Sequence, residues 1–474
     1  MGIETVLLLL ALIFGFYMAW SIGANDVANA MGTSVGSGAL TLKRAVILAA
    51  ILEFSGAFFV GSHVSETVRK GIVNANLFTG EPLIFVYGML AALLAAAAWL
   101  QVASYYGWPV STTHSIVGSI IGFGMVFGGM QAIHWDKVGG IVASWILSPF
   151  LSGTISFLIF TLLQKKIFYA ANPVQAAKKM TPVLVFFVFV ILTLVMVFKG
   201  LKNLHLDLSF LSAFTVAVFV GLLSAGVSYF LVLRIKAEPH VERVRVMQPP
   251  QVVNGMERAL KHLLRVRTAA VGEFKYQIAR VLDTVDDLST VVKEGTEREL
   301  GSSEYKTVER IFVYLQILSA AFVAFAHGAN DVANAIGPLS AVITVLKNGI
   351  VELKMTVPIW VLALGGIGIT TGLAAWGWRV IETVGKKITE LTPSRGFAAE
   401  FGAATTIVLA SRLSLPISTT HTLVGAVLGV GLARGIHALN LNTVRDIILS
   451  WLVTIPVGAG LAVLFFYILK GIFG

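Results

Sequence analysis

The sequence places the same cluster of carboxylate and amide side chains at two distant positions. SIGANDVANA begins at Ser21 and AHGANDVANA begins at Ala326, so one aspartate and two asparagines recur at an identical spacing. On a helix, residues three and four positions apart lie on one face, so each copy brings a carboxylate and an amide together. The residues concerned are Asn25, Asp26 and Asn29, and Asn330, Asp331 and Asn334.

These groups suggest a site for a hard cation and a protonated oxyanion. Carboxylate and amide oxygens suit an ion such as sodium, and the clusters lack the soft or imidazole ligands typical of copper or zinc sites. The same oxygens accept hydrogen bonds from phosphate, whereas sulfate carries no proton at neutral pH and is repelled by a buried carboxylate. Amides and small residues also hold membrane helices together, but that alternative leaves the aspartates unexplained.

A second motif is also duplicated. WPVSTTHSIVG begins at Trp108 and LPISTTHTLVG begins at Leu415. A proline followed by three hydroxyl residues predicts a helix start, and the free N–H groups of a helix N-terminus can bind an anion. Ordinary N-capping is the alternative, but it leaves the duplication unexplained. The candidate phosphate-binding residues are therefore Asp26, Asn29, Ser111, Thr112, Thr113, Asp331, Asn334, Ser418, Thr419 and Thr420.

Two lone acids complete the candidate cation site. Glu53 and Glu400 each lie in an apolar stretch rich in small residues, where an ionised carboxylate is costly. A buried structural acid bonded to a hydroxyl explains them equally well. The candidate sodium ligands are Asn25, Asp26, Glu53, Asn330, Asp331 and Glu400. His114 and His421 stay outside the core site, because each could simply bond to neighbouring backbone.

No catalytic residue is expected. A serine–histidine pair needs a neighbouring acid to orient the histidine, and none is evident near Ser111 and His114. The absence of cysteine excludes disulfides and thiolate chemistry.

The elements that hold these residues must be membrane helices. Of the 474 residues, 56% are hydrophobic and only 13% are charged, and the mean hydropathy is +0.84. Soluble proteins carry about 25% charged residues. We predict an all-α polytopic membrane protein with about 10–12 transmembrane helices, since each helix needs about 20 apolar residues. The apolar runs are Val6–Trp20, Ala45–Gly61, Leu83–Leu100, Val138–Leu163, Val183–Phe198, Leu208–Leu233, Ile311–Ala326, Val357–Trp376 and Ile447–Leu469.

The duplicated motifs divide the chain into two halves. The copies lie 305 and 307 residues apart, which predicts a first repeat over 1–165 and a second over 311–474. Connecting helices occupy 166–233, and a polar linker occupies 234–310. About seven spans separate the two first motifs, and an odd number would invert the second copy, as in many secondary transporters.

Both halves contain an interruption. The apolar pattern breaks at Pro109 and Pro416, and the stretches that follow are short and rich in glycine. Irregular backbone at membrane depth is tolerated where protein or a watery cavity satisfies it. We therefore predict broken helices or re-entrant hairpins at these two places.

The net charge of +10 is explained by topology rather than by nucleic-acid binding. The stretch from Arg234 to Arg310 holds 14 of the 35 lysines and arginines, and basic residues in loops mark the cytoplasmic side of membrane proteins. The linker is therefore predicted to form cytoplasmic helices.

The N-terminus has no basic segment before its apolar run. We therefore interpret it as a retained membrane helix rather than as a secretory signal.

The doubled GANDVANA, together with PVSTTH and PISTTH, resembles the inorganic phosphate transporter family, whose animal members are sodium–phosphate symporters. The resemblance covers about 1–230 and 310–474, whereas the linker carries none of the signature. It implies two inverted repeats around a central substrate site, with the signature residues of the family at the two asparagine–aspartate clusters and at residues 111–114 and 418–421. The functionally important membrane glutamates of the family match Glu53 and Glu400. The full GANDVANA form resembles the sodium-coupled branch.

The expected function is therefore phosphate import across the plasma (inner) membrane by symport with sodium. The alternatives are coupling to protons, transport of a metal phosphate, and a permease for another oxyanion such as sulfate. The expected partners are inorganic phosphate, sodium ions as co-substrate and the lipid bilayer. No nucleic acid and no resident cofactor are expected, and a homo-oligomer is compatible with the sequence.

Overall fold

The computed structural model describes residues 2–61, 72–197, 208–235, 250–300, 303–351, 357–412 and 417–474. Within these ranges the regular secondary structure is helical, apart from one isolated bridge between Val73 and Ile133, and turns or extended segments join the helices. Leu415 and Pro416, which open the second hydroxyl motif, lie outside the described residues, as does 236–249 of the linker.

The described part of the first half contains five long helices: α1 (Ile3–Gly36), α2 (Leu42–Val60), α4 (Pro82–Tyr106), α5 (Thr112–Gly128) and α6 (Trp135–Leu163). Short helical turns accompany them at Ala75–Phe78, Gly129–Ala132 and Gln164–Phe168. The connecting segment contains α7 (Pro173–Val195), α8 (Phe210–Leu233), α9 (Pro250–Ala269) and α10 (Glu273–Leu300).

The second half contains α11 (Ser303–Asp331), α12 (Ala333–Asn348), α13 (Ile359–Trp376), α14 (Trp378–Glu382), α15 (Pro393–Arg412), α16 (Thr419–Arg434) and α17 (Leu441–Phe473). Short turns lie at Thr383–Lys387 and Ile436–Ala438. The second motif therefore breaks its helix between α11 and α12, whereas the first motif lies inside the continuous α1.

The helices confirm the predicted polytopic membrane protein. In the described part of the chain, nine segments are long and apolar enough to cross a bilayer. Large apolar side chains also cover the outer surface, as on α8, where Leu211 is 73% exposed and Phe219 is 69% exposed. Such a surface suits lipid rather than water, because soluble proteins rarely expose large contiguous apolar patches.

The two halves pack against each other reciprocally. A Cβ added to Gly23 in the first motif would lie 1.9 Å from the Ile369 carbonyl oxygen of α13. The equivalent Gly328 in the second motif approaches α2, where an added Cβ would lie 2.1 Å from the Glu53 carbonyl oxygen. Only glycine allows these close approaches. Each half therefore supplies a helix that covers the motif helix of the other.

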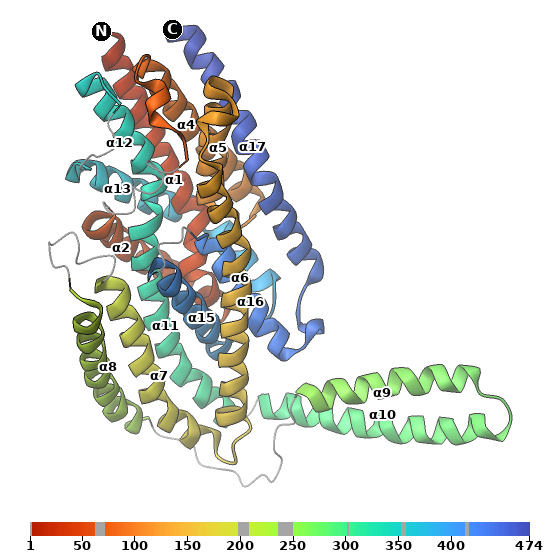
Figure 1. The fold of residues 1–474 in the computed structure, drawn as a ribbon. Helices are drawn as coiled ribbons and strands as arrows, with labels where there is room; N and C mark the ends of the chain where they lie inside the picture. The colour runs from red at the N-terminus through yellow and green to blue at the C-terminus, as the bar shows by residue number, and fades with distance from the viewer. Residues whose placement is uncertain are drawn as a thin grey trace.

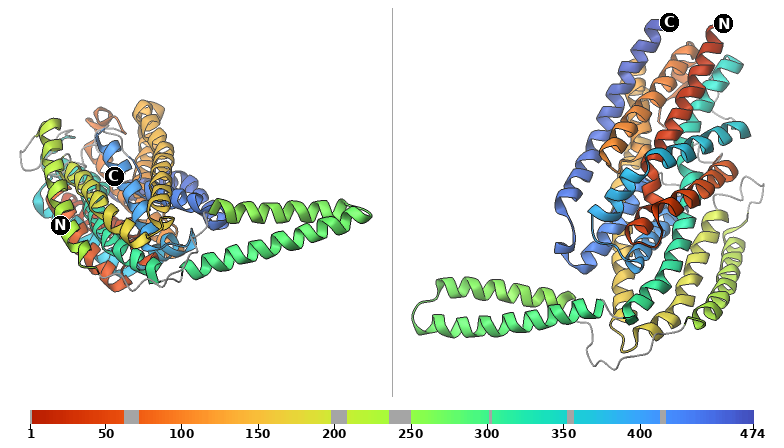
Figure 2. Two further views of the ribbon diagram at one scale, coloured as in Figure 1. Left: turned by 90° about the horizontal axis from the view of Figure 1, so that it is seen from below. Right: turned by 180° about the vertical axis from the view of Figure 1, so that it is seen from behind.

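The motif helices also run in opposite directions. In Figure 1, α1 begins at the end of the molecule that carries both termini, whereas α11 begins at the opposite end, next to α10. The view from behind in Figure 2 agrees. These directions and the reciprocal packing support the predicted inverted repeat.

The interruption predicted at Pro109 separates α4 from α5. Gly107 ends α4 in the left-handed conformation, with φ 69°, and an extended segment leads to the N-cap Ser111. The helices that follow the hydroxyl motifs are short, with 17 residues in α5 and 16 in α16. The 16 residues of α16 fall short of the roughly 20 of a full span. Helix α5 continues through the turn Gly129–Ala132, so that Thr112–Ala132 reaches 21 residues and is one of the nine candidate spans found in the described residues.

The linker forms a helical hairpin. Helices α9 and α10 lie side by side and project away from the bundle, as Figures 1 and 2 show. The transmembrane helix α11 begins at Ser303, inside the segment that the sequence analysis assigns to the linker.

Candidate substrate and cation site

The first motif meets the hydroxyl segment of the second half. The Asn29 amide nitrogen donates to the Thr420 hydroxyl at 2.9 Å and to Asp26 Oδ1 at 3.2 Å. The Thr420 hydroxyl donates to Asp26 Oδ1 at 3.1 Å. All three residues are buried. Residues 391 and 394 positions apart in the sequence therefore form one hydrogen-bonded group.

The second motif meets the hydroxyl segments in an equivalent way. The Asn334 amide nitrogen donates to the hydroxyl oxygens of Thr112 at 3.2 Å and Thr113 at 3.4 Å. The Thr419 hydroxyl donates to Asp331 Oδ2 at 2.9 Å. Asn334 thus bonds across to the first half, as Asn29 bonds across to the second. Six of the ten predicted phosphate-binding residues lie in hydrogen bonds that cross between the halves: Asp26, Asn29, Thr112, Thr113, Asn334 and Thr420.

The hydroxyl segments begin helices, as predicted. Ser111 Oγ accepts from the His114 backbone N–H at 3.3 Å at the start of α5, and Ser418 Oγ accepts from that of His421 at 3.1 Å at the start of α16. Both serines therefore also act as N-caps, which was the alternative interpretation. The helix N-termini carry partial positive charge and lie at the aspartates, so they favour carboxylates and oxyanions there.

A buried histidine joins the carboxylates. His327 Nε2 lies 2.8 Å from Asp331 Oδ2 and 3.7 Å from Asp26 Oδ2, and its Nδ1 lies 3.3 Å from Glu53 Oε2. The expectation that the clusters lack an imidazole is therefore wrong. His327 precedes Asp331 by one helical turn, so both side chains share a face. The sequence offers one sign of this histidine: a titratable residue, His327, directly precedes the second motif at the position where the first copy has the apolar Ile22.

The cluster has an excess of acceptors. Three carboxylates surround one imidazole, so negative charge remains even if the imidazole is protonated. Asp26 Oδ2, Asn29 Oδ1 and both carboxylate oxygens of Glu53 are buried without a hydrogen-bond partner. Uncompensated buried charge is strongly unfavourable. One ligand atom each from Asp26, His327 and Asp331 lie within 4.8 Å of one another, so a single cation could contact all three.

Asn25 faces away from this cluster. Its amide nitrogen donates to Ser104 Oγ and to the Trp108 carbonyl oxygen, each at 3.0 Å, and its Oδ1 accepts from the Val110 N–H at 3.2 Å. These bonds hold the extended segment before α5. Asn330 instead stays beside the cluster, donating to Asp331 Oδ1 at 2.7 Å.

Glu400 forms a separate polar cluster. One carboxylate oxygen accepts from Thr33 at 2.5 Å, Ser34 at 3.0 Å and Gln316 at 3.5 Å, and the other accepts from Ser319. The four donors come from α1 and α11, and none of them is predicted from the sequence. This arrangement matches the alternative of a buried acid bonded to hydroxyls, whereas Glu53 lies with the two aspartates.

His114 and His421 lie in a ring cluster. The His114 ring centroid is 3.5 Å from that of Trp145, and the His421 centroid is 3.6 Å from that of Trp451. The two histidine rings are 4.3 Å apart. His421 Nδ1 also lies 3.3 Å from the Trp145 carbonyl oxygen. These contacts pack the starts of α5 and α16 against α6 and α17.

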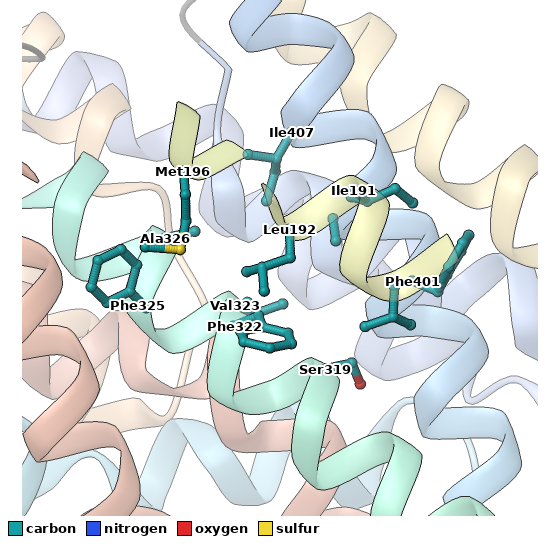
Figure 3. A pocket seen from close by; sticks show the side chains of 12 residues that line it. Ile191, Leu192, Met196, Ser319, Phe322, Val323, Phe325, Ala326, Phe401 and Ile407 are labelled. Atoms are coloured by element: carbon teal, nitrogen blue, oxygen red, sulfur yellow. The ribbon is translucent and has the colours of Figure 1, made fainter. Parts of the chain in front are cut away.

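The cavity in Figure 3 has a different chemistry. It lies among α7, α11 and α15, and Ser319 is the one polar side chain among the twelve residues that line it. An apolar cavity offers an oxyanion no donors, so it does not compete with the polar cluster as a substrate site.

Comparisons with known proteins agree with this chemistry. The model of the phosphate transporter family matches residues 22–462. The chain is 47% identical over 471 residues to an inorganic phosphate transporter of Arabidopsis thaliana described as chloroplastic, covering 99% of this chain and 73% of that one. It is 46% identical over 474 residues to a Chlamydia pneumoniae protein named as a phosphate permease, covering 98% and 99% of the two chains.

A solved structure is also similar. The protein described as the sodium-dependent phosphate transporter superposes with a TM-score of 0.78 at 38% identity, covering 98% of this chain and 99% of that one. The family model spans both motif pairs and nearly the whole membrane part. The chain is therefore a member of the phosphate transporter family, a membrane transporter and not an enzyme.

Proposed function

We propose that the protein imports inorganic phosphate across the plasma (inner) membrane by symport with sodium ions, through one central site built by both halves. The observation that carries this proposal is the pairing of Asn29 with Thr420 and of Asn334 with Thr113, around the carboxylates of Asp26 and Asp331. The similarity to a protein described as a sodium-dependent phosphate transporter supports the choice of cation.

Phosphate is recognised through donors and acceptors together. The hydroxyls of Thr112 and Thr113, with those of the N-cap serines and the free N–H groups of α5 and α16, donate to the phosphate oxygens. The hydroxyls of Thr419 and Thr420 join them by turning from Asp331 and Asp26 to the phosphate. The carboxylate of Asp26 or Asp331 accepts a hydrogen bond from the protonated oxygen of phosphate. Sulfate has no such proton, so a carboxylate against it is left unpaired, which gives selectivity against sulfate.

Sodium offsets the excess negative charge. Asp26, Asp331 and Glu53 supply oxygen ligands of the kind that a hard cation prefers. Phosphate is itself an anion, so it enters a cluster of carboxylates only when cations are bound. Cation and phosphate therefore increase each other's affinity, and thermodynamic linkage makes that effect reciprocal.

Transport follows from a site shared between two repeats. We infer that the halves are inverted repeats, and that one moves against the other to open the site to each side in turn. The loss of the cross-half hydrogen bonds during this motion would be offset by bonds to phosphate. The linker with α9 and α10, which is rich in lysine and arginine, then lies on the cytoplasmic side.

Phosphate uptake into proteoliposomes tests this function. A sodium gradient and a proton gradient are imposed separately, and sulfate is added as a competitor. Sodium symport predicts uptake driven by sodium alone and resistant to sulfate. Uptake that follows only the proton gradient would contradict sodium coupling, and strong competition by sulfate would contradict the assigned substrate. Uptake that requires a divalent metal would instead indicate a metal phosphate.

A further inference from the structure

Arg379 on α14 lacks a carboxylate partner within the described part of the chain. The ion pairs found there involve His327, Arg395, Arg434 and Arg445, and none includes Arg379. Charged side chains inside or at the edge of a membrane protein usually pair with another group or mark an ion or substrate path. The central site uses no residue of α14.

Neutral groups hold the Arg379 guanidinium in place. Its central carbon lies 4.8 Å from the ring centroid of Tyr105, 5.4 Å from that of Trp376 and 5.1 Å from that of Trp378. One terminal nitrogen donates to the Tyr105 carbonyl oxygen at 2.8 Å. The Nε atom is buried without a hydrogen-bond partner. Because a guanidinium offers five N–H donors, donors remain for a ligand.

The position of Arg379 connects it to the central site. Helix α14 passes α1 at the first motif, where a Cβ on Gly377 would lie 2.3 Å from a methyl group of Val27. The Arg379 carbonyl oxygen lies against Gly107, directly before the segment that Asn25 holds through the Trp108 carbonyl oxygen. Arg379 thus borders both α1 and the approach to α5.

The aromatic side chains around Arg379 reach the surface. Tyr105 is 54% exposed, and Trp378 is 45% exposed. The half-buried guanidinium is therefore open to a ligand from outside the helix bundle, while the rings cover its faces. Arginine is well suited to this task, because its planar fork binds two oxygens of one phosphate group and its face stacks on aromatic rings.

We propose that Arg379, with Tyr105, Trp376 and Trp378, forms an accessory anion site (the Arg379 site) that binds a phosphate group outside the central site. The phosphate group has two sources. Free phosphate can be captured there before it reaches the central site, and this version of the proposal rests on the proposed transport function. Alternatively, the headgroup of an anionic phospholipid occupies the Arg379 site, and this version does not depend on the transport function.

The test uses the full-length protein and three variants. Arg379→Gln removes the charge, Arg379→Lys keeps the charge but removes the fork, and Arg445→Gln removes one positive charge at an exposed position on α17. Each variant is first checked for a single elution peak and an unchanged thermal midpoint. The KM and kcat for phosphate uptake are then measured at two ionic strengths with constant sodium. Retention of phosphatidylglycerol by the purified protein is measured by native mass spectrometry.

Capture of free phosphate predicts that Arg379→Gln raises the KM about tenfold without changing kcat, as expected for one charged hydrogen bond. The KM of this variant also becomes less sensitive to ionic strength, whereas Arg445→Gln behaves as the unmodified protein. A lipid headgroup predicts lost phosphatidylglycerol retention with an unchanged KM. If Arg379→Gln does not fold, Arg379→Lys takes its place, and the same change in KM or in lipid retention is expected at a smaller size.

Unchanged KM and unchanged lipid retention overturn the proposal. If the unmodified protein takes up no phosphate, the proposed function fails, and lipid retention still decides the Arg379 site.

Discussion

His327 is the residue on which the charge balance of the central cluster depends. It faces Asp26, Glu53 and Asp331 together, and all four side chains are buried. Without it, three carboxylates would face one another, and the N–H donors beside them would be the neutral amides of Asn29 and Asn330. A bound cation is the other means of offsetting that charge, so His327 and sodium should support the fold in similar ways.

Replacing His327 with alanine should therefore make the stability of the protein depend on sodium. Removing one partner of a buried charged pair lowers the free energy of unfolding by about 3–5 kcal/mol. The thermal midpoint should therefore fall clearly in choline chloride and recover in sodium chloride. The midpoint of the purified protein is measured in both salts. His437→Ala removes an exposed histidine and serves as the control. An equal fall in both salts would show that sodium does not substitute for the lost donor.

Residue spacing predicted the aspartates and asparagines but not His327 or the surroundings of Glu400. Duplication marks the aspartates and asparagines, whereas His327 has no histidine counterpart, because the first motif carries Ile22 at the same position. The donors to Glu400 lie more than 80 residues away in the sequence, at Thr33, Ser34, Gln316 and Ser319. No local pattern links residues that meet only through helix packing.

At the scale of elements, glycine contacts set how closely the motif helices approach their partners. Gly328 touches the backbone of α2 at Glu53. In Gly328→Ala, the added carbon would overlap a carbonyl oxygen, so α11 and α2 must separate. Overpacking costs about 1–3 kcal/mol, and it should move Glu53 away from His327.

The expected result for Gly328→Ala is a lower thermal midpoint together with weaker phosphate uptake. Gly460→Ala is the matched control, because nothing lies within 4 Å of an added Cβ there and alanine favours a helix. Thermal unfolding and uptake are measured on both variants. Equal behaviour of the two would contradict the close packing of α11 on α2.

The starts of the short helices should affect both stability and binding. Ser418→Ala removes the N-cap of α16, and Ser209→Ala removes the equivalent cap of α8, which accepts from the Ser212 N–H at 3.2 Å. Each change should cost about 1 kcal/mol. Only Ser418→Ala should raise the KM for phosphate, since α8 lies outside the site. A raised KM in both variants would indicate a general effect of destabilisation.

At the scale of the whole molecule, the duplicated sequence predicted two halves, but not which groups pair across them. The motif spacing placed Asn29 and Thr420 in separate halves, and only the packing of α1 against α16 brings them together. The broken helix before α5 was predictable, because proline and glycine mark it locally. The reciprocal contact of each motif with the other half depends on the arrangement of all the helices.

The hairpin of α9 and α10 should be dispensable for the fold of the membrane part. It projects away from the bundle in Figures 1 and 2. Replacement of 250–300 by a short glycine–serine linker should leave sodium-driven phosphate uptake within about twofold, since flexible linkers are tolerated where few contacts are lost. Uptake by the shortened protein in proteoliposomes checks this. A complete loss of uptake by a protein that still folds would assign the hairpin a role in transport.

Both halves should build one phosphate site between them. The number of radiolabelled phosphate ions bound per chain at equilibrium in sodium decides this, measured for the unmodified protein, Asp26→Asn and Asp331→Asn, with the exposed Asp446→Asn as control. We expect one phosphate per chain, phosphate binding weakened about 100-fold or more in either single aspartate variant, and no change in the control. Two phosphates per chain, one of which survives in each aspartate variant, would rule out a shared site.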